Sequence, residues 1–137
     1  MSSSMKAIAR AAMRFVELGQ AIFLDDATTV HEMTAFLPAK VPLTVITNNL
    51  AVIVELSGQP GIELIGVEAE LYASFSNAIR GEDRTIGGAT LAEGIAVKTV
   101  GQMTLPIVAA LILALFLRGM PAVSLPRGWQ CVAGADR

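Results

Sequence analysis

Two short polar segments each follow an apolar run and carry side chains that suit a small polar ligand. One is Asp25-Asp-Ala-Thr-Thr29 and the other is Thr47-Asn-Asn49. The carboxylates of the first segment accept hydrogen bonds from sugar hydroxyls, and its Thr hydroxyls donate to phosphate oxygens. Both segments lead into predicted helices, where free amides attract anions. The alternative is that these residues only cap helices and close turns.

The elements that position these segments alternate along the chain. Short apolar runs predict three strands, at Ala21–Leu24, Leu43–Ile46 and Ile62–Val67. Helices are predicted at Met5–Leu18, from Thr29 to a point before Pro38, and from Asn48 or Asn49 to about Ser57. This alternation implies parallel strands with right-handed crossovers. In such a sheet, ligands bind beyond the carboxyl ends of the strands, where both polar segments lie.

Two local patterns make these predictions specific. In the first helix, the apolar residues that share one face are Met5, Ile8, Ala12, Phe15 and Val16. In the second helix, Thr29 and Glu32 have the spacing of a capping box, in which both side chains satisfy free amides at the helix start.

After Val67 the alternation of strands and helices loosens. We expect a helix over Glu70–Arg80, a Gly-rich loop over Gly81–Gly88 and a helix over Thr90–Val97. The first of these helices is predicted to present Leu71, Phe75, Ala78 and Ile79. The apolar run Leu105–Leu117 is shorter than the roughly 20 residues of a membrane span, so a packed or exposed helix is favoured. The tail from Gly119 is expected to be irregular. The predicted fold class is α/β, with a Rossmann-like partial parallel sheet and a mostly helical C-terminal part.

Composition excludes several classes of function. The chain has 137 residues, of which 53% are hydrophobic and 16% charged, so a folded core is expected. A net charge of −2 argues against direct binding of nucleic acid. The N-terminus lacks the apolar core of a signal peptide, which predicts a cytoplasmic location. Neither the single Cys131 nor the single His31 has neighbours at metal-ligand spacing, so no metal site is expected.

Four stretches of the front half form a recognisable pattern: Lys6-Ala-Ile-Ala-Arg10, Ala21-Ile-Phe-Leu-Asp-Asp-Ala-Thr-Thr29, Leu43-Thr-Val-Ile-Thr-Asn48 and Gly61-Ile-Glu-Leu-Ile65. Together they resemble the sensor domain of DeoR-type transcriptional regulators, over residues 6 to 67. The resemblance implies binding of a phosphorylated sugar or related metabolite, with DNA bound by a separate N-terminal helix-turn-helix that is not expected in this chain. The residues predicted to bind the effector are Asp25, Asp26, Ala27, Thr28, Thr29, Thr47 and Asn48.

A second set of stretches carries a different resemblance: Ile65-Gly-Val-Glu-Ala-Glu-Leu-Tyr72, Asn77-Ala-Ile-Arg80, Gly87-Gly-Ala-Thr-Leu-Ala-Glu-Gly-Ile-Ala-Val-Lys98 and Leu105-Pro-Ile-Val108. Over residues 62 to 108 the chain resembles threonine dehydratase and its relatives, which use pyridoxal phosphate. Those enzymes need a Schiff-base Lys, a phosphate loop and a partner for the ring nitrogen. The resemblance supplies none of the three here, and Lys98 does not match the catalytic Lys.

The sequence therefore predicts three segments: a partial sensor domain over 1–67, a threonine dehydratase-like fragment over 68–108, and an apolar helix with an irregular tail over 109–137. The expected function is sensing of a small phosphorylated metabolite, without catalysis and with no cofactor. The alternatives are a degenerate pyridoxal-phosphate lyase without activity, or a non-functional gene-fusion product. Because half a sheet leaves the third strand with an open edge, a homo-oligomer or soluble aggregate is expected.

Overall fold

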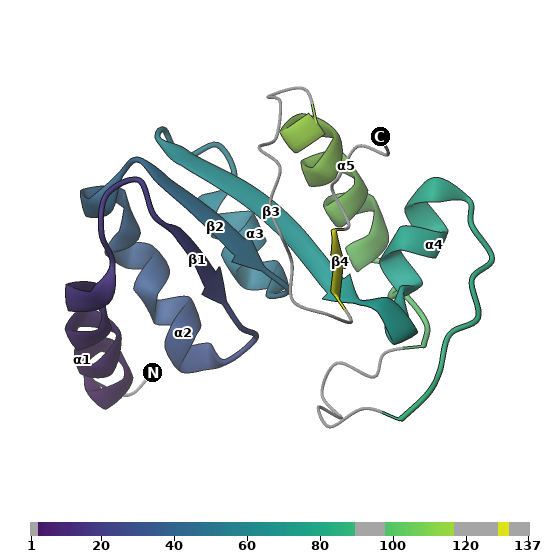
Figure 1. The fold of residues 1–137 in the computed structure, drawn as a ribbon, viewed down its shortest axis with the longest axis horizontal. Coiled ribbons are helices and arrows are strands. Elements are labelled where there is room, and N and C mark those ends of the chain that lie inside the picture. The colour runs from purple at the N-terminus through teal and green to yellow at the C-terminus, as the bar shows by residue number, and fades with distance from the viewer. Residues whose placement is uncertain (1–2, 90–97, 117–128, 132–137) are drawn as a thin grey trace. The chain divides into compact units, whose positions relative to one another are not determined.

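The computed structural model describes residues 3–89, 98–116 and 129–131 of the chain (Figure 1). The chain divides into two compact units, residues 1–65 and 66–137. This division falls close to the boundary expected after Val67. Each unit is described by itself.

The first unit contains the predicted alternation of helices and strands. Its elements are helix α1 (Ser3–Ala12) with the 3-10 turn η1 (Met13–Phe15), strand β1 (Ala21–Leu24), helix α2 (Thr28–His31), the 3-10 turns η2 (Glu32–Ala35) and η3 (Leu37–Lys40), strand β2 (Leu43–Thr47), helix α3 (Leu50–Leu56) and strand β3 (Ile62–Ala69). Of these, β3 continues into the second unit.

The sheet confirms the predicted α/β fold class. Strands β1 and β2 are parallel, with Ala21 opposite Thr44 and Leu24 opposite Thr47. The strand order is β1-β2-β3, and the three strands form a parallel sheet with helices between them (Figure 1). Strand β2 is buried along almost its whole length, as expected of a strand in a parallel sheet. The core residues of this sheet and of α3 include Leu24, Leu43, Val45, Val52, Leu56, Ile62, Leu64 and Ile65.

The predicted buried face of α1 is wrong for two of its residues. Ile8 is 58% exposed and Phe15 is 68% exposed, whereas Ala9 and Met13 are buried. Helix α1 packs against α2 and η2, and the small side chain of Ala9 allows a close approach there. Of the other predicted residues, Val16 is buried and Met5 and Ala12 are half-buried, so the buried stripe includes part of the predicted face and adds Ala9 and Met13.

The second helix also differs from its prediction. Helix α2 begins at Thr28 after Ala27, and no side chain caps it, so the expected capping box of Thr29 and Glu32 does not form. The α-helix ends at His31 and continues as 3-10 turns, the second of which contains Pro38. Glu32 is instead buried in the first of these turns. By contrast, α3 has a cap as predicted, and of the two candidates, Asn48 and Asn49, it is Asn49 whose side chain accepts hydrogen bonds from two amides of the helix start.

The second unit contains the end of β3, the 3-10 turn η4 (Glu70–Tyr72), helix α4 (Ser74–Arg80), helix α5 (Thr104–Phe116) and strand β4 (Trp129–Cys131). Strand β4 is antiparallel to β3, with Val67 opposite Cys131 and Ala69 opposite Trp129. The tail was expected to be irregular, but Trp129–Cys131 form a strand. The edge of β3 was expected to be open, but Val67–Ala69 pair with this strand. The predicted helix over Thr90–Val97 lies outside the described residues.

The region predicted as one helix over Glu70–Arg80 divides into η4 and α4, and of its predicted apolar residues Phe75 and Ile79 are half-buried, whereas Leu71 and Ala78 are exposed. The Glu68 carboxylate accepts hydrogen bonds from the backbone amides of Phe75, at 3.1 Å, and Ser76, at 2.6 Å. These bonds tie the helix start to β3, and the small side chains of Ser74 and Ser76 become buried. Leu71, which was expected to pack, is 47% exposed.

Helix α5 confirms the predicted apolar helix over its 13 residues. Among the described residues, no helix combines the length and apolar character needed to cross a membrane. The loop predicted over Gly81–Gly88 is also present, without regular secondary structure after its first residue.

Two glycines with positive φ in the first unit differ in how closely other atoms approach them. Gly61 has φ +77°, and a Cβ atom added there would lie 2.8 Å from Val41 Cβ. Gly58 has φ +80° but nothing within 4 Å of the added atom. Both replacements by Ala introduce the strain of a left-handed backbone, about 1 kcal/mol, and only Gly61→Ala adds a clash. We expect Gly61→Ala to lower the free energy of unfolding by about 1–3 kcal/mol more than Gly58→Ala.

Urea unfolding of both variants beside the unaltered chain measures this difference. Equal losses at the two positions would mean that Val41 moves aside freely, in contradiction to the packing described.

Candidate functional site

Strands β1 and β2 end at the same edge of the sheet, and a buried hydroxyl joins their ends. Leu24 lies opposite Thr47 in the parallel register. The Thr47 hydroxyl donates a hydrogen bond to the backbone oxygen of Leu24, at 2.7 Å, and accepts one from the backbone amide of Asn49, at 3.0 Å. The side chain of Thr47 is fully buried. Its role is therefore to hold the end of β1 against the turn that follows β2.

Asn49 adds a second connection between the two loops. Its side-chain Nδ2 donates to the backbone oxygen of Asp25, at 3.3 Å, while Oδ1 accepts from the amides of Ala51 and Val52. The segments Asp25–Thr29 and Thr47–Asn49 thus lie side by side, as expected from the sequence. The sequence identified Asn49 as a possible cap but not as the residue that links the two loops. Thr47, two residues earlier, was the available signal, because both residues lie in one polar segment.

This bonding changes what the site offers to an anion. At the start of α3, the amides of Ala51 and Val52 are already bonded to Asn49, so they are not free for a ligand as the sequence suggested. At the start of α2, no side-chain cap is present, and the first amides of a helix have no partner within it. Among the described residues, the start of α2 is therefore the more open of the two to an acceptor group.

The predicted residues around the start of α2 are accessible. The Asp25 carboxylate accepts a hydrogen bond from the backbone amide of Ala27, at 3.0 Å, which closes a tight turn before the helix. Asp25, Asp26, Ala27 and Thr28 are exposed, and Thr29 is half-buried. The turn therefore presents one engaged carboxylate, one accessible carboxylate and the hydroxyls of two Thr residues.

Asn48, in the loop that follows β2, has a side-chain atom whose hydrogen bonding is incomplete. Its side-chain Oδ1 is buried and has no hydrogen-bond partner among the described residues. A buried carbonyl oxygen without a partner costs about 1–3 kcal/mol, so it identifies a position where a donor from outside would be stabilising.

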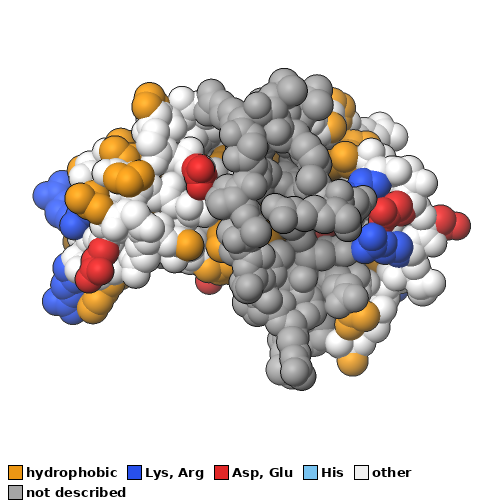
Figure 2. Space-filling view, turned by 45° about the horizontal axis from the view of Figure 1, so that its top comes forward, with side chains coloured by type: hydrophobic (Ala, Val, Ile, Leu, Met, Phe, Trp, Pro, Cys, Tyr) orange, Lys and Arg blue, Asp and Glu red, His pale blue; other side chains and the backbone are white. Residues whose placement is uncertain are grey.

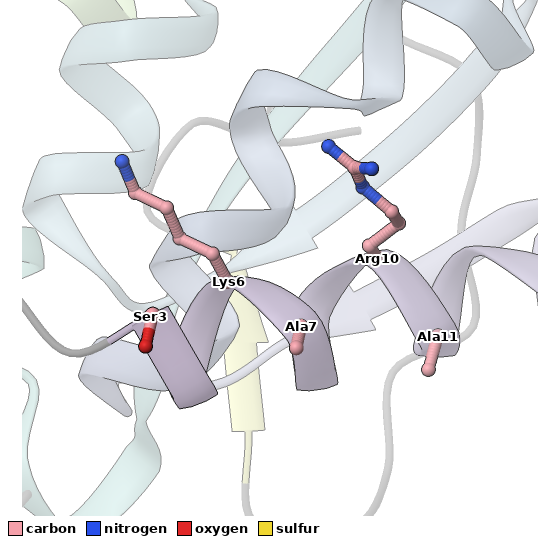
Figure 3. A pocket seen from close by; sticks show the side chains of 5 residues that line it. All are labelled: Ser3, Lys6, Ala7, Arg10 and Ala11. Carbon is pink, nitrogen blue, oxygen red and sulfur yellow. The ribbon is translucent and has the colours of Figure 1, made fainter.

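A separate hollow lies along α1. It is lined by Ser3, Lys6, Ala7, Arg10 and Ala11 (Figure 3). Lys6 and Arg10 rise from the same side of the helix, and the Arg10 guanidinium lies 5.3 Å from the centre of the Phe36 ring. Basic and hydrophobic side chains are visible together at this end of the first unit (Figure 2). The described residues that line the hollow all belong to α1, so fewer elements contribute to it than to the strand edge.

No cation site was predicted, and within residues 3–89, 98–116 and 129–131 no three His, Cys, Asp or Glu side chains gather as metal ligands. The His31 side chain is 24% exposed, and its Nε2 lies 3.1 Å from Glu55 Oε1.

A parallel α/β sheet with two polar loops at the carboxyl ends of neighbouring strands defines a class of small-molecule binding domains. The comparison with known families is more specific. The chain belongs to the family of the DeoR C-terminal sensor domain, whose model matches residues 2–86. This match extends past Val67 into the segment that resembles threonine dehydratase. Nothing in the comparisons supports that second resemblance.

The chain is also similar to a curated protein, the uncharacterized HTH-type transcriptional regulator YulB of Bacillus subtilis (strain 168). The two are 39% identical over 77 residues, which cover 54% of this chain and 30% of the relative. The chain thus matches less than a third of the length of that regulator. No solved structure matches the chain.

The role assigned to Thr47 gives a prediction about stability. Thr47→Val keeps the volume of the side chain but leaves the Leu24 oxygen and the Asn49 amide without their partner, which should cost roughly 2 kcal/mol. Thr47→Ser keeps the hydroxyl and removes one buried methyl group, which should cost about 1 kcal/mol. We therefore expect the Val variant to be the less stable of the two in chemical unfolding. A Val variant as stable as the Ser variant would show that the hydroxyl bridge contributes little.

Proposed function

We propose that the first unit binds a small phosphorylated sugar, or a related metabolite, as the effector-sensing part of a DeoR-type regulator. The observation that carries the proposal is the unpartnered Oδ1 of Asn48, buried beside the loops that end β1 and β2. Membership of the sensor-domain family supports the assignment of this edge to an effector. The similarity to an HTH-type regulator supports a role in transcription, with DNA bound by another part of such a protein.

The proposed binding mode assigns one group of the ligand to each part of the edge. The phosphate lies at the open start of α2, where the Thr28 and Thr29 hydroxyls add donors to the backbone amides. With only four residues, α2 contributes a small dipole, so direct hydrogen bonds carry most of the interaction. The accessible Asp26 carboxylate and the Asn48 oxygen accept hydrogen bonds from sugar hydroxyls. Asp25, Ala27 and Thr47 shape the turn and hold it in position.

Two further expectations belong to this proposal. A cytoplasmic location follows from sensing an internal metabolite. Association of the chain into a homo-oligomer stays a prediction, although its original reason is weaker now that β4 pairs with part of β3.

Binding is tested by calorimetric titration with a panel of sugar phosphates and with the same sugars lacking phosphate. We expect at least one phosphorylated sugar to bind and its unphosphorylated form to bind at least tenfold more weakly, because hydrogen bonds to a charged group contribute about 1.5–3 kcal/mol. Thr28→Val and Asn48→Ala should each weaken binding about tenfold. Thr85→Val, an exposed change outside the proposed site, is the control and should leave the affinity unchanged.

Binding that ignores the phosphate, or that survives both site variants, would contradict the proposed mode. Equal losses in the Thr85 control would indicate a general effect on folding.

The resemblance to threonine dehydratase leads to a proposal of catalytic silence. Lys98 is exposed, whereas a Schiff-base Lys in an enzyme is held in a pocket with its cofactor. We expect added pyridoxal phosphate to give no aldimine absorbance that depends on Lys98, and no release of ammonia from threonine. Lys98→Ala is compared with Lys6→Ala, since any exposed Lys reacts weakly with an aldehyde. Loss of both the band and the ammonia in Lys98→Ala alone would establish the enzyme interpretation instead.

A further inference from the structure

One exposed row of α1 and η1 consists of positive charges, and we call it the basic row. Its members Lys6, Arg10 and Arg14 follow one another at spacings of four residues and are all exposed. Residues four apart lie above one another on a helix, so the three cations form a line. No Asp or Glu occurs between Ser3 and Val16, although the chain as a whole has a net charge of −2. The positive charge is therefore local to this helix.

The cations of the basic row have no acidic partner within the part of the chain that the structure describes. The Arg10 guanidinium lies 5.3 Å from the centre of the Phe36 ring, and that of Arg14 lies 4.7 Å from the centre of the Phe15 ring. Contact with an aromatic face positions a guanidinium without neutralising its charge. Two of the three cations are thus held in place and remain able to pair with an acidic group.

A second exposed row of the same helix is apolar, and we call it the apolar row. Ile8 is 58% exposed, and Phe15, seven residues further along, is 68% exposed. Seven residues are close to two helical turns, so both side chains lie on one side of the helix. Leu18, in the turn that follows, is 65% exposed. Apolar side chains that are grouped on a surface and bordered by charge are typical of a site of association.

Small side chains lie between the basic row and the apolar row. They are Ser3, Ala7 and Ala11, and Figure 3 shows them on a different side of the helix from Lys6 and Arg10. A helix turns by about 100° per residue, so Ala7 falls between its two neighbours in the sequence, one basic and one apolar. These small side chains would let the backbone of a second helix approach closely.

The hollow that these residues line has a volume of about 430 Å³. A pocket for a small molecule has a similar volume, but it encloses most of its ligand. The described residues that line this hollow all come from one helix. The hollow therefore suits an elongated partner that lies along α1.

We propose that this face of α1 is a docking surface for an amphipathic helix of another polypeptide, in which acidic residues lie beside an apolar row. The acidic residues of the partner pair with Lys6, Arg10 and Arg14. Its apolar residues cover Ile8 and Phe15, and its backbone lies over the small side chains between the two rows. The docking surface does not depend on the effector site proposed above, since it uses none of the residues of that site.

Charge argues against a second copy of this chain as the partner. Two α1 helices that met through this face would bring six cations together without a described acidic residue between them, and like charges in contact oppose association. Helix α3 exposes Val54 and Glu55 side by side, but it offers a single carboxylate to the three cations of the basic row. A helix with several acidic residues complements the row better.

The two exposed rows also argue against a membrane and against nucleic acid. A helix that lies on a membrane inserts a broad apolar face, whereas the apolar face of α1 that includes Ala9 and Met13 is buried within the fold. Nucleic acid would neutralise the basic row through its phosphates but would leave Ile8 and Phe15 uncovered. An acidic amphipathic helix satisfies both rows at once.

The test uses a fluorescent synthetic peptide of about 18 residues, long enough to form a helix, with Glu at spacings of four beside a row of Leu. A second peptide, with Lys in place of every Glu, is the charge control. Binding of the unaltered chain is measured by fluorescence anisotropy. We expect the acidic peptide to bind at least tenfold more tightly than the Lys peptide, and the difference to shrink as salt is added.

Two variants test the two rows, and each has a matched control at an exposed position outside α1. Lys6→Gln removes a charge from the basic row and is compared with Lys98→Gln, whereas Ile8→Ala shortens the apolar row and is compared with Val54→Ala. We expect Lys6→Gln and Ile8→Ala each to weaken binding of the acidic peptide about threefold, since exposed contacts contribute modestly. Both controls should leave the affinity unchanged. If a variant does not fold, amide chemical shifts of the unaltered chain replace it, and the acidic peptide should shift the amides of α1 and η1.

Several results would overturn the proposal. They are equal binding of the two peptides, losses in the controls as large as those in Lys6→Gln and Ile8→Ala, shifts confined to elements other than α1 and η1, and no binding at about 1 mM acidic peptide. Tighter binding to phosphatidylserine vesicles or to a DNA duplex, weakened by Lys6→Gln, would assign the face to a membrane or to nucleic acid instead. Dimerisation of the chain that Ile8→Ala abolishes would assign it to a second copy.

Discussion

The arrangement of the candidate site depends on the hydroxyl of Thr47. It lies in the core with no exposed surface, and it bonds to the end of β1 and to the residue that caps α3. A buried polar group is stable only when its hydrogen bonds are satisfied, so this residue constrains three segments at once. The loop after β1 is further fixed by Asn49, which contacts the backbone of Asp25 while capping the helix. Strand ends, cap and turn therefore form one connected unit.

That connected unit separates supporting residues from residues that remain available. The side-chain polar atoms of Thr47 and Asn49 form hydrogen bonds within the protein. Asn48, between them, has a buried side-chain oxygen without a partner among the described residues. The two helix starts differ because Asn49 caps α3, whereas no side chain caps α2. The helices that follow the two loops are joined by a contact in which His31 Nε2 lies 3.1 Å from Glu55 Oε1.

Membership of the sensor-domain family agrees with the half of the chain whose sequence pattern was clearest. The apolar runs of β1, β2 and β3 are short and separated by helical segments, and this pattern predicted their order and parallel pairing. Strands β2 and β3 are mostly buried, whereas in β1 only Leu24 is. The resemblance to the DeoR sensor domain also pointed to the loops at the carboxyl ends of β1 and β2. In the second unit the pattern was weaker. There the burial of Ser74 and Ser76 and the pairing of β4 with β3 depend on contacts between residues far apart in the chain.

The sequence by itself determined the three parallel strands, a cap for α3 at Asn48 or Asn49 and the polar character of the two loops. These follow from local periodicity and from side chains that bond to nearby backbone. Only the tertiary structure decided which face of α1 is buried, since Ala9 and Ile8 are both apolar and the choice depends on how closely α2 and η2 approach. It also decided that Thr47 is a support and that Glu55 meets His31. Such pairings join separate elements, and no local pattern encodes the distance between them.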